Sequence, residues 1–291
     1  PPEALAGFDA FWRETFAANA AIDPRATITE APDPHPTHRV RYVSFDHLGG
    51  IRSGGWLLEP RDGPAVRGLV IGHGYGGRGD CGTGFLPRDA AAILPCAPGF
   101  HRSARADLPD VSDRHVIHGI TAKETYLIRA CVAGLWSAAT VLLQRHPGIG
   151  SRLYYFGESF GGGLGALALP WDQRVAAACL VVPTFGHHPW RLRCPCVGSG
   201  EAVRRWHAEH PEVVEVLAYY DAAVAATRIR IPVVGVPAFF DPAVPPPGQW
   251  AVINGLAGEV DLCPVTAGHF ENPTALADYR RQREALERRF I

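Results

Sequence analysis

One short segment limits the fold of this chain more than any other. The run 152–156 is largely apolar and leads into Gly157-Glu-Ser-Phe-Gly161, and small, helix-compatible residues follow at 164–169. A G-x-S-x-G sequence in this setting predicts a strand, a sharp turn and a helix. The flanking glycines matter because a serine at a strained backbone angle needs neighbours without side chains, so that strand and helix can approach. The segment therefore predicts an exposed serine at the carboxyl edge of a sheet.

A second interpretation of this region is a dinucleotide-binding loop, because Gly163-Leu-Gly-Ala-Leu-Ala168 fits a relaxed glycine fingerprint. Such a site requires an acidic residue about 20 positions further on, at the end of the next strand. The next predicted strand ends in Leu180-Val-Val-Pro-Thr-Phe185, which contains no acid. We therefore favour a nucleophile elbow, in which the backbone N–H after the serine points at a developing oxyanion.

Apolar runs alternate with helical patterns along the chain. Expected strands lie at 39–45 and 55–58, which suit an antiparallel hairpin, and at 67–72, 90–98, 152–157, 174–182, 229–240 and 259–264. Strand–helix alternation of this kind predicts parallel strands with right-handed crossovers. The expected fold class is α/β, specifically an α/β-hydrolase fold. Its sheet would be mainly parallel and twisted, with about eight strands, the first ones antiparallel, and helices on both faces.

We expect one domain over 1–291 with two additions to the sheet. The first is an N-terminal extension over about 2–36, with an amphipathic helix at 2–19 and then a Pro-rich connector. The second is an excursion over about 183–228, which suits a lid or an oligomer interface. Thr121-Ala-Lys-Glu124 matches a capping box, and the long helix behind it stops at His146-Pro.

Composition excludes several classes of function. The formal net charge of −1 provides no global field to attract nucleic acid or an anionic membrane. The sequence shows no obvious run of about 18 apolar residues, so we expect no membrane span. The N-terminus lacks a signal-peptide pattern. Seven cysteines, an odd number and mostly in apolar surroundings, suit a reduced compartment, and we expect a cytoplasmic protein.

The candidate metal-binding segment is Cys194-Pro-Cys196, which has His187 and His188 nearby. The C-x-C spacing is not that of a zinc ribbon. We therefore expect neither a metal nor a cofactor.

Ser159, Asp241 and His269 follow one another in the order serine, acid, histidine that α/β-hydrolases use. Each comes just after a predicted strand, so all three are expected at one edge of the sheet. Serine needs an imidazole to accept its proton, and the imidazole needs a carboxylate to fix its tautomer. Rival acids and bases are less well placed; they are Asp221, Glu215, His73 and His101.

The segment His73-Gly-Tyr-Gly-Gly-Arg78 follows the buried strand at 67–72. Alone it would be read as a glycine-rich turn. Upstream of an elbow it suits the loop that supplies a second oxyanion donor. We therefore expect the backbone N–H groups of Tyr75 and Phe160 to form an oxyanion hole.

With these segments in hand, the chain resembles carbohydrate esterase family seven, the acetyl xylan esterases and cephalosporin C deacetylases. The matching pieces span nearly the whole chain; they are Phe8-Asp-Ala-Phe-Trp12, His73–Arg78, Gly119-Ile, Tyr126, the elbow, Tyr219–Val224, Asp241 with Pro245-Pro246, and His269 with Glu271. The resemblance implies a metal-free Ser159–His269–Asp241 triad with Tyr75 and Phe160 as oxyanion donors. It also implies removal of acetyl groups from small acylated sugars and the cephalosporin C side arm, and often a hexameric ring.

Three departures from the family pattern bear on substrate and assembly. Arg102-Ser-Ala104 stands where the family has Arg-Gly-Gln, Phe160 replaces the usual glutamine after the nucleophile, and His269-Phe-Glu271 replaces a His-Glu pair. The sequence therefore predicts a serine carboxylesterase for short acyl esters, with acetyl esters favoured. Alternatives are a prolyl-oligopeptidase-like peptidase and a catalytically silent α/β-hydrolase that only binds its ligand.

Overall fold

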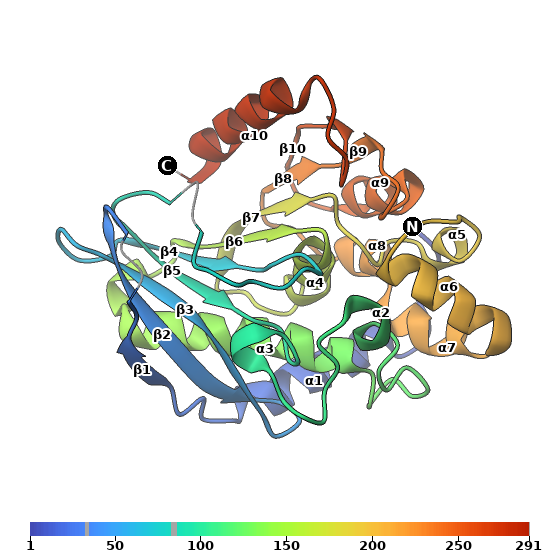
Figure 1. Cartoon of the computed structure of the whole chain (residues 1–291), viewed down its shortest axis with the longest axis horizontal. Coiled ribbons are helices and arrows are strands. Elements are labelled where there is room, and N and C mark those ends of the chain that lie inside the picture. Colours follow the sequence, from blue (N-terminus) through green and yellow to red (C-terminus); the bar gives the residue numbers. More distant parts are fainter. Residues whose placement is uncertain (33–34, 83–85, 291) are drawn as a thin grey trace.

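The computed structural model describes residues 1–32, 35–82 and 86–290, and a nine-stranded sheet runs through them (Figure 1). The strand order is β1-β2-β3-β5-β4-β6-β7-β8-β10. The bounds are β1 Thr27–Glu30, β2 His38–His47, β3 Ile51–Pro60, β4 Arg67–Ile71, β5 Ala90–Pro95, β6 Leu153–Glu158, β7 Val175–Val181, β8 Val233–Val236 and β10 Val260–Leu262. Strands β1, β2, β3 and β5 pair antiparallel, and all pairings from β5 to β10 are parallel. The predicted α/β-hydrolase sheet is confirmed.

Two strand expectations need correction. The connector before residue 36 contains β1, which pairs with β2 in the register Thr27↔Ser44, so the sheet has nine strands instead of about eight. The single strand expected at 229–240 is two, because Pro237 has no N–H to continue the ladder. Beyond it β9 (Ala238–Phe240) leaves the main sheet and pairs in parallel with β11 (Val265–Ala267).

Helices cover both faces of the sheet, as predicted (Figure 1). Helices α1 (Phe8–Ala20), α3 (Leu127–Arg145) and α4 (Phe160–Ala168) share one large buried core with residues of β3, β5 and β6. Helix α10 (Ala275–Phe290) lies on the other face, where Leu286 and Phe290 pack with residues of β7 and β8. The sheet is therefore buried between two layers, which suits its long apolar strands.

Helix α3 corrects the expectation that no segment could qualify as a membrane span. Among the described residues it is the one helix long and apolar enough to cross a membrane by length and composition. However, 72% of the apolar 18-residue stretch of this helix is buried inside the protein. Because core helices pass the same test, the finding is weak evidence for a span.

Two predicted helix starts are wrong. The first helix begins at Phe8, not residue 2, and Leu5 lies outside it and exposed. Thr121-Ala-Lys-Glu124 is no capping box, because α3 begins at Leu127 with Tyr126 at its N-cap. The Glu124 side chain instead pairs with Lys123. Sequence spacing alone does not distinguish a cap from a turn that lies just before a helix.

The excursion after β7 consists of four short helices and a 3-10 turn. They are α5 (His188–Arg191), α6 (Ser199–Glu209), α7 (Val213–Leu217), η3 (Ala218–Tyr220) and α8 (Ala222–Ala226). Helix α1 packs against the η3 part of this excursion, where Trp12 Nε1 donates a 2.8 Å hydrogen bond to the Tyr219 carbonyl. Helix α9 (Pro246–Gly255) then connects β9 to β10.

The segment Arg102-Ser-Ala104, which departs from the family pattern, is tied closely to β2, to β3 and to the residue after β5. The Arg102 guanidinium carbon lies 3.3 Å from the centre of the Tyr42 ring. Ser103 is buried; its hydroxyl donates to the Cys96 carbonyl at 2.7 Å and accepts the Gly54 N–H at 2.9 Å. The serine therefore fastens this loop to the sheet where the family has a glycine.

We expect Ser103→Ala to lower the free energy of unfolding by about 1–3 kcal/mol, because it leaves a buried N–H and a buried carbonyl without a partner. The measurement is urea denaturation followed by circular dichroism. Ser151→Ala, at an exposed turn, is the matched control and should leave the midpoint within error. Equal midpoints for the two variants would contradict the role given to the Ser103 hydroxyl.

Candidate active site

Ser159 stands on a sharp turn between β6 and α4. Its backbone angles are φ 54° and ψ −108°, a strained conformation for a residue with a side chain. The flanking glycines are required by packing, as predicted. A Cβ on Gly157 would lie 2.4 Å from the Gly161 carbonyl oxygen, and one on Gly161 would lie 2.8 Å from the Gly72 carbonyl carbon. Close approach of three backbone segments therefore fixes the serine in place.

The three predicted side chains meet at the carboxyl edge of the sheet. Ser159 Oγ lies 2.8 Å from His269 Nε2, and His269 Nδ1 lies 2.8 Å from Asp241 Oδ2. Asp241 directly follows β9, and His269 follows β11 after one glycine, so the small second sheet brings acid and base together. This hydrogen-bonded chain can move a proton from the hydroxyl to the imidazole.

The Asp241 carboxylate is fully buried and held by several donors. Its Oδ1 accepts the N–H groups of Ala243 and Val244, each at 2.9 Å. Its Oδ2 accepts Gln249 Nε2 at 2.8 Å in addition to the imidazole. These bonds orient the carboxylate toward His269 before any substrate arrives.

Gln249 on α9 is the supporting residue that sequence reasoning missed. It is fully buried; its amide nitrogen also donates to the Val244 carbonyl, and its oxygen accepts the Ala238 N–H at 2.7 Å. One amide thus joins β9, the loop after Asp241 and α9. A glutamine directly before the apolar run Trp250–Ile253 was the available signal, because buried polar groups need partners.

The pKa of His269 is raised, first because Asp241 accepts its hydrogen bond, while burial acts in the opposite direction. The negative charges of Asp241 and Glu158 add to the rise. The imidazole side chain remains 28% exposed, so solvent or a substrate can reach it. A raised pKa makes the imidazole a stronger proton acceptor, which a general base requires.

The expected oxyanion residues lie against each other. The Tyr75 and Phe160 rings stack with centroids 3.9 Å apart and planes 19° apart. Within the described part of the chain, the Tyr75 backbone N–H finds no hydrogen-bond acceptor. A Cβ on Gly74 would lie 4.0 Å from Ser159 Cβ, so this loop runs beside the serine. The stacked rings therefore hold two backbone segments next to Ser159.

The rival residues have other roles. His73 is buried, and its Nε2 accepts the Ala97 N–H at 2.8 Å. The exposed His101 ring lies against Gly77. The Asp221 carboxylate caps α8 and binds the N–H groups of His187 and His188. Glu215 lies exposed on α7. None of the four is bonded to Ser159 or His269.

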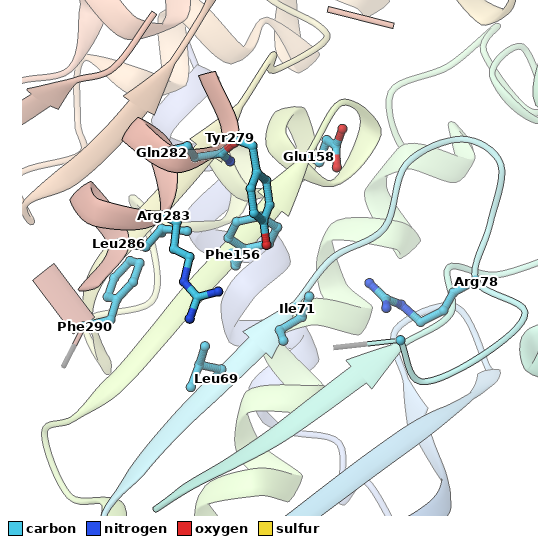
Figure 2. A pocket seen from close by; sticks show the side chains of 11 residues that line it. Leu69, Ile71, Arg78, Phe156, Glu158, Tyr279, Gln282, Arg283, Leu286 and Phe290 are labelled. Atoms are coloured by element: carbon cyan, nitrogen blue, oxygen red, sulfur yellow. The ribbon is translucent and has the colours of Figure 1, made fainter. Parts of the chain in front are cut away.

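A cavity of about 330 Å³ lies beneath α10, against β4 and β6. Figure 2 shows its lining side chains, with Leu69, Ile71 and Phe156 on the strands and Tyr279, Gln282, Arg283, Leu286 and Phe290 on the helix. Glu158 reaches its border, but Ser159, Asp241 and His269 do not line it. The three hydrogen-bonded side chains of Ser159, His269 and Asp241 are therefore not among the residues that line this cavity.

The candidate metal ligands of the excursion do not form a cluster in the described part of the chain. Over residues 1–32, 35–82 and 86–290, no cluster of three or more His, Cys, Asp or Glu could hold an ion. Cys194 and Cys196 lie half-buried in the excursion, and the His187 and His188 side chains make contacts of their own.

The strand order, the strained serine and the converging histidine and aspartate define an α/β-hydrolase. The chain belongs to the acetyl xylan esterase family, whose model matches residues 3–280. Family membership makes it a carboxylic ester hydrolase of the carbohydrate esterase class. No curated protein matches the chain.

Solved structures agree on the fold. Acetyl xylan esterase 1 from Thermoanaerobacterium sp. JW/SL YS485 superposes with a TM-score of 0.84 at 18% identity, covering 97% of this chain and 94% of that one. Acetyl xylan esterase from Paenibacillus sp. R4 gives 0.81 at 23% identity, covering 98% and 96%. The Pyrococcus horikoshii acylaminoacyl peptidase gives 0.64 at 16% identity, covering 87% of this chain but 42% of its own.

We expect Asp241→Asn to lower the pKa of His269. The substitution removes the carboxylate that raises this pKa, while burial, which lowers it, remains. A titration of the imidazole signals by ¹⁵N NMR measures the change, with the wild-type pKa expected above that of a free imidazole. Glu215→Gln, on the exposed surface of α7, is the control and should not move the titration. An unchanged or higher pKa in Asp241→Asn would contradict the electrostatic account.

Proposed function

We propose that the protein is a serine carboxylesterase that removes short acyl groups, chiefly acetyl, from small acylated sugars or related esters such as the cephalosporin C side arm. The observation that carries the proposal is the continuous pair of 2.8 Å hydrogen bonds from Ser159 Oγ through His269 to Asp241. Membership of the acetyl xylan esterase family supports the substrate class. Residues 183–228 are proposed to form a lid or an interface of the same domain.

In the proposed reaction Ser159 Oγ attacks the ester carbonyl carbon while His269 Nε2 takes the hydroxyl proton. The tetrahedral intermediate collapses when the carbon–oxygen bond to the alcohol breaks, and His269 returns its proton to that oxygen. Water then attacks the acyl-enzyme with His269 again as base, releasing the acid and Ser159. Asp241 keeps the imidazole in one orientation and stabilises its cation throughout.

The negative oxygen of each tetrahedral intermediate is proposed to bind the backbone N–H groups of Tyr75 and Phe160. Such donors act best when they are already in place, and one of them contributes about 3 kcal/mol of transition-state stabilisation. The stacked rings support this arrangement, because neither backbone segment can shift without separating them. The aromatic ring of Phe160 is fully buried, so it shapes the site without entering it.

Self-association is also proposed. Phe239, Phe240 and Phe270 are 66%, 56% and 61% exposed beside the loops that carry Asp241 and His269. Exposed aromatic side chains gathered in this way are typical of contact surfaces. A homo-oligomer is therefore expected, with the hexamer implied by the family resemblance as its first candidate form. A cytoplasmic location remains a prediction.

The first test compares hydrolysis of aryl acetate, butyrate and octanoate by the wild type and by Ser159→Ala. We expect acetate to be the best substrate and the variant to lose activity by at least about 10⁴-fold, since the nucleophile is gone. The rate should fall on the acid side as His269 takes a proton, and the midpoint should be raised relative to that of a free imidazole, because Asp241 raises the pKa of His269.

The outcomes of this test separate the alternatives. Equal rates for wild type and variant would refute the mechanism, and a preference for octanoate would refute the acetyl assignment. Efficient cleavage of peptide amides would favour a peptidase, a class whose fold the chain also matches. Failure of a fluorophosphonate probe to label Ser159 would favour a silent binding protein.

A second test concerns Gly268, which precedes the histidine. A Cβ at this position would lie 2.3 Å from Asp241 Oδ2, so Gly268→Ala must displace the carboxylate or the histidine loop. We expect kcat to fall by about 10²-fold or more, because small displacements of catalytic groups have effects of this size. Gly148→Ala, whose Cβ would make only a 3.5 Å contact, is the control. Full activity in Gly268→Ala would contradict the importance of this contact.

A further inference from the structure

Arg191, the last residue of α5, carries a buried positive charge without a partner. Its side chain is almost completely enclosed, with the whole residue 4% exposed. Its Nη1 has no hydrogen-bond acceptor in the described part of the chain. Its guanidinium carbon lies 5.3 Å above the Phe185 ring, which is a weaker contact than an ion pair. A buried, unpaired charge is costly, so its presence needs an explanation.

The acidic groups around Arg191 form no ion pair with it. The Asp221 carboxylate favours the charged guanidinium from a distance, but its oxygens already accept the backbone N–H groups of His187, Ala223 and His188. The other acidic neighbours are the Cys196 thiol and the Tyr75 and Tyr126 hydroxyls, whose pKa values are raised by burial, so they stay uncharged near neutrality. The guanidinium is therefore a buried positive charge that is only partly offset.

The N-terminus of α6 lies directly beside this guanidinium. A Cβ on Gly200 would point toward the start of the helix and would lie 3.6 Å from Arg191 Nη2. The first residues of a helix have no intrahelical acceptor for their N–H groups. Here Gly198 provides no side-chain cap, and no described residue accepts the N–H groups of Ser199, Gly200 or Glu201. The unpaired cation and the positive end of the helix dipole thus face each other.

We propose that Arg191 and the first turn of α6 form a binding site for a small free oxyanion, a carboxylate or a phosphate. An oxyanion between the guanidinium and the helix N–H groups would satisfy both sets of donors, as anions do at helix N-termini. Without an anion these two positive groups repel each other. The site is distinct from Ser159 and from the oxyanion hole, and binding to it does not depend on the proposed esterase activity.

Access and electrostatics are compatible with an anion at this position. A surface groove of about 560 Å³ between α2 (Ser112–His115) and α6 reaches Cys196, Gly198 and Glu201 at this end of the helix. The Glu201 carboxylate is the one negative group in the turn, and it is paired with Arg204 and Arg205. Its charge is thereby offset and does not repel an incoming anion strongly.

The site adjoins the loop that follows Asp241. The Val197 N–H donates to the Pro242 carbonyl at 2.9 Å, and the Ala243 carbonyl oxygen lies 3.4 Å from the Cβ position of Gly200. An anion that steadies the start of α6 would therefore also steady the loop behind the triad acid.

The experiment measures the thermal unfolding midpoint of the full chain in Tris chloride. Acetate or phosphate is added at constant ionic strength by replacing chloride. We expect the wild-type midpoint to rise with saturation, by about 5 °C or more near 100 times Kd. Arg191→Met should lose this rise, and its midpoint without oxyanion should equal or exceed that of the wild type, because a buried unpaired charge has been removed.

Arg193→Met is the matched control, since Arg193 lies two residues away, exposed and over the Trp190 ring. It should keep the full oxyanion response. A rise with acetate alone identifies a carboxylate site, and a rise with phosphate alone identifies a phosphate site. A response that persists in Arg191→Met, or no oxyanion response in the wild type, would overturn the proposal. Hydrolysis of a neutral aryl acetate is measured in parallel, so that failure of the esterase assignment is recognised separately.

Discussion

The buried carboxylate of Asp241 is the group on which the arrangement of this site depends. It accepts two backbone N–H groups, the Gln249 amide and the His269 imidazole, which come from the loop after β9, from α9 and from the loop after β11. A fully buried carboxylate is stable only when such donors are present. The same bonds that stabilise the charge therefore also fix the relative positions of three chain segments. His269 reaches Ser159 because this cluster holds it there.

Much of the fold could be predicted from the sequence because its signals are local. The elbow requires small residues at fixed positions, and each candidate triad residue follows a strand. The order and spacing of residues were therefore sufficient to predict the elbow and to select the candidate triad. The errors concern interactions between distant segments. Strand β1 has no apolar pattern of its own and forms because β2 offers it a free edge. Likewise Gln249 is recognisable as a supporting residue only once Asp241 lies 2.8 Å away.

The departures from the family pattern have physical counterparts in the structure. Phe160 stands where the resembled family has a glutamine, and its ring stacks on Tyr75. Ring packing therefore positions these two backbone segments, where an amide would use hydrogen bonds. Ser103 replaces a glycine and adds hydrogen bonds between its loop and β3. Both changes act on the supports of the site and leave Ser159, His269 and Asp241 in hydrogen-bonding geometry.

The unpaired Nη1 of Arg191 contrasts with the buried carboxylates of the same region, whose hydrogen-bonding needs are met. Asp221 and Asp241 are both buried, and each accepts several donors. A protein that meets these requirements elsewhere would gain stability from an apolar residue at position 191. Residues that lower the stability of the fold without an evident structural gain are typical of functional sites. The start of α6 contacts the loop after Asp241, so the proposed anion would be connected to the carboxylate that accepts the His269 hydrogen bond.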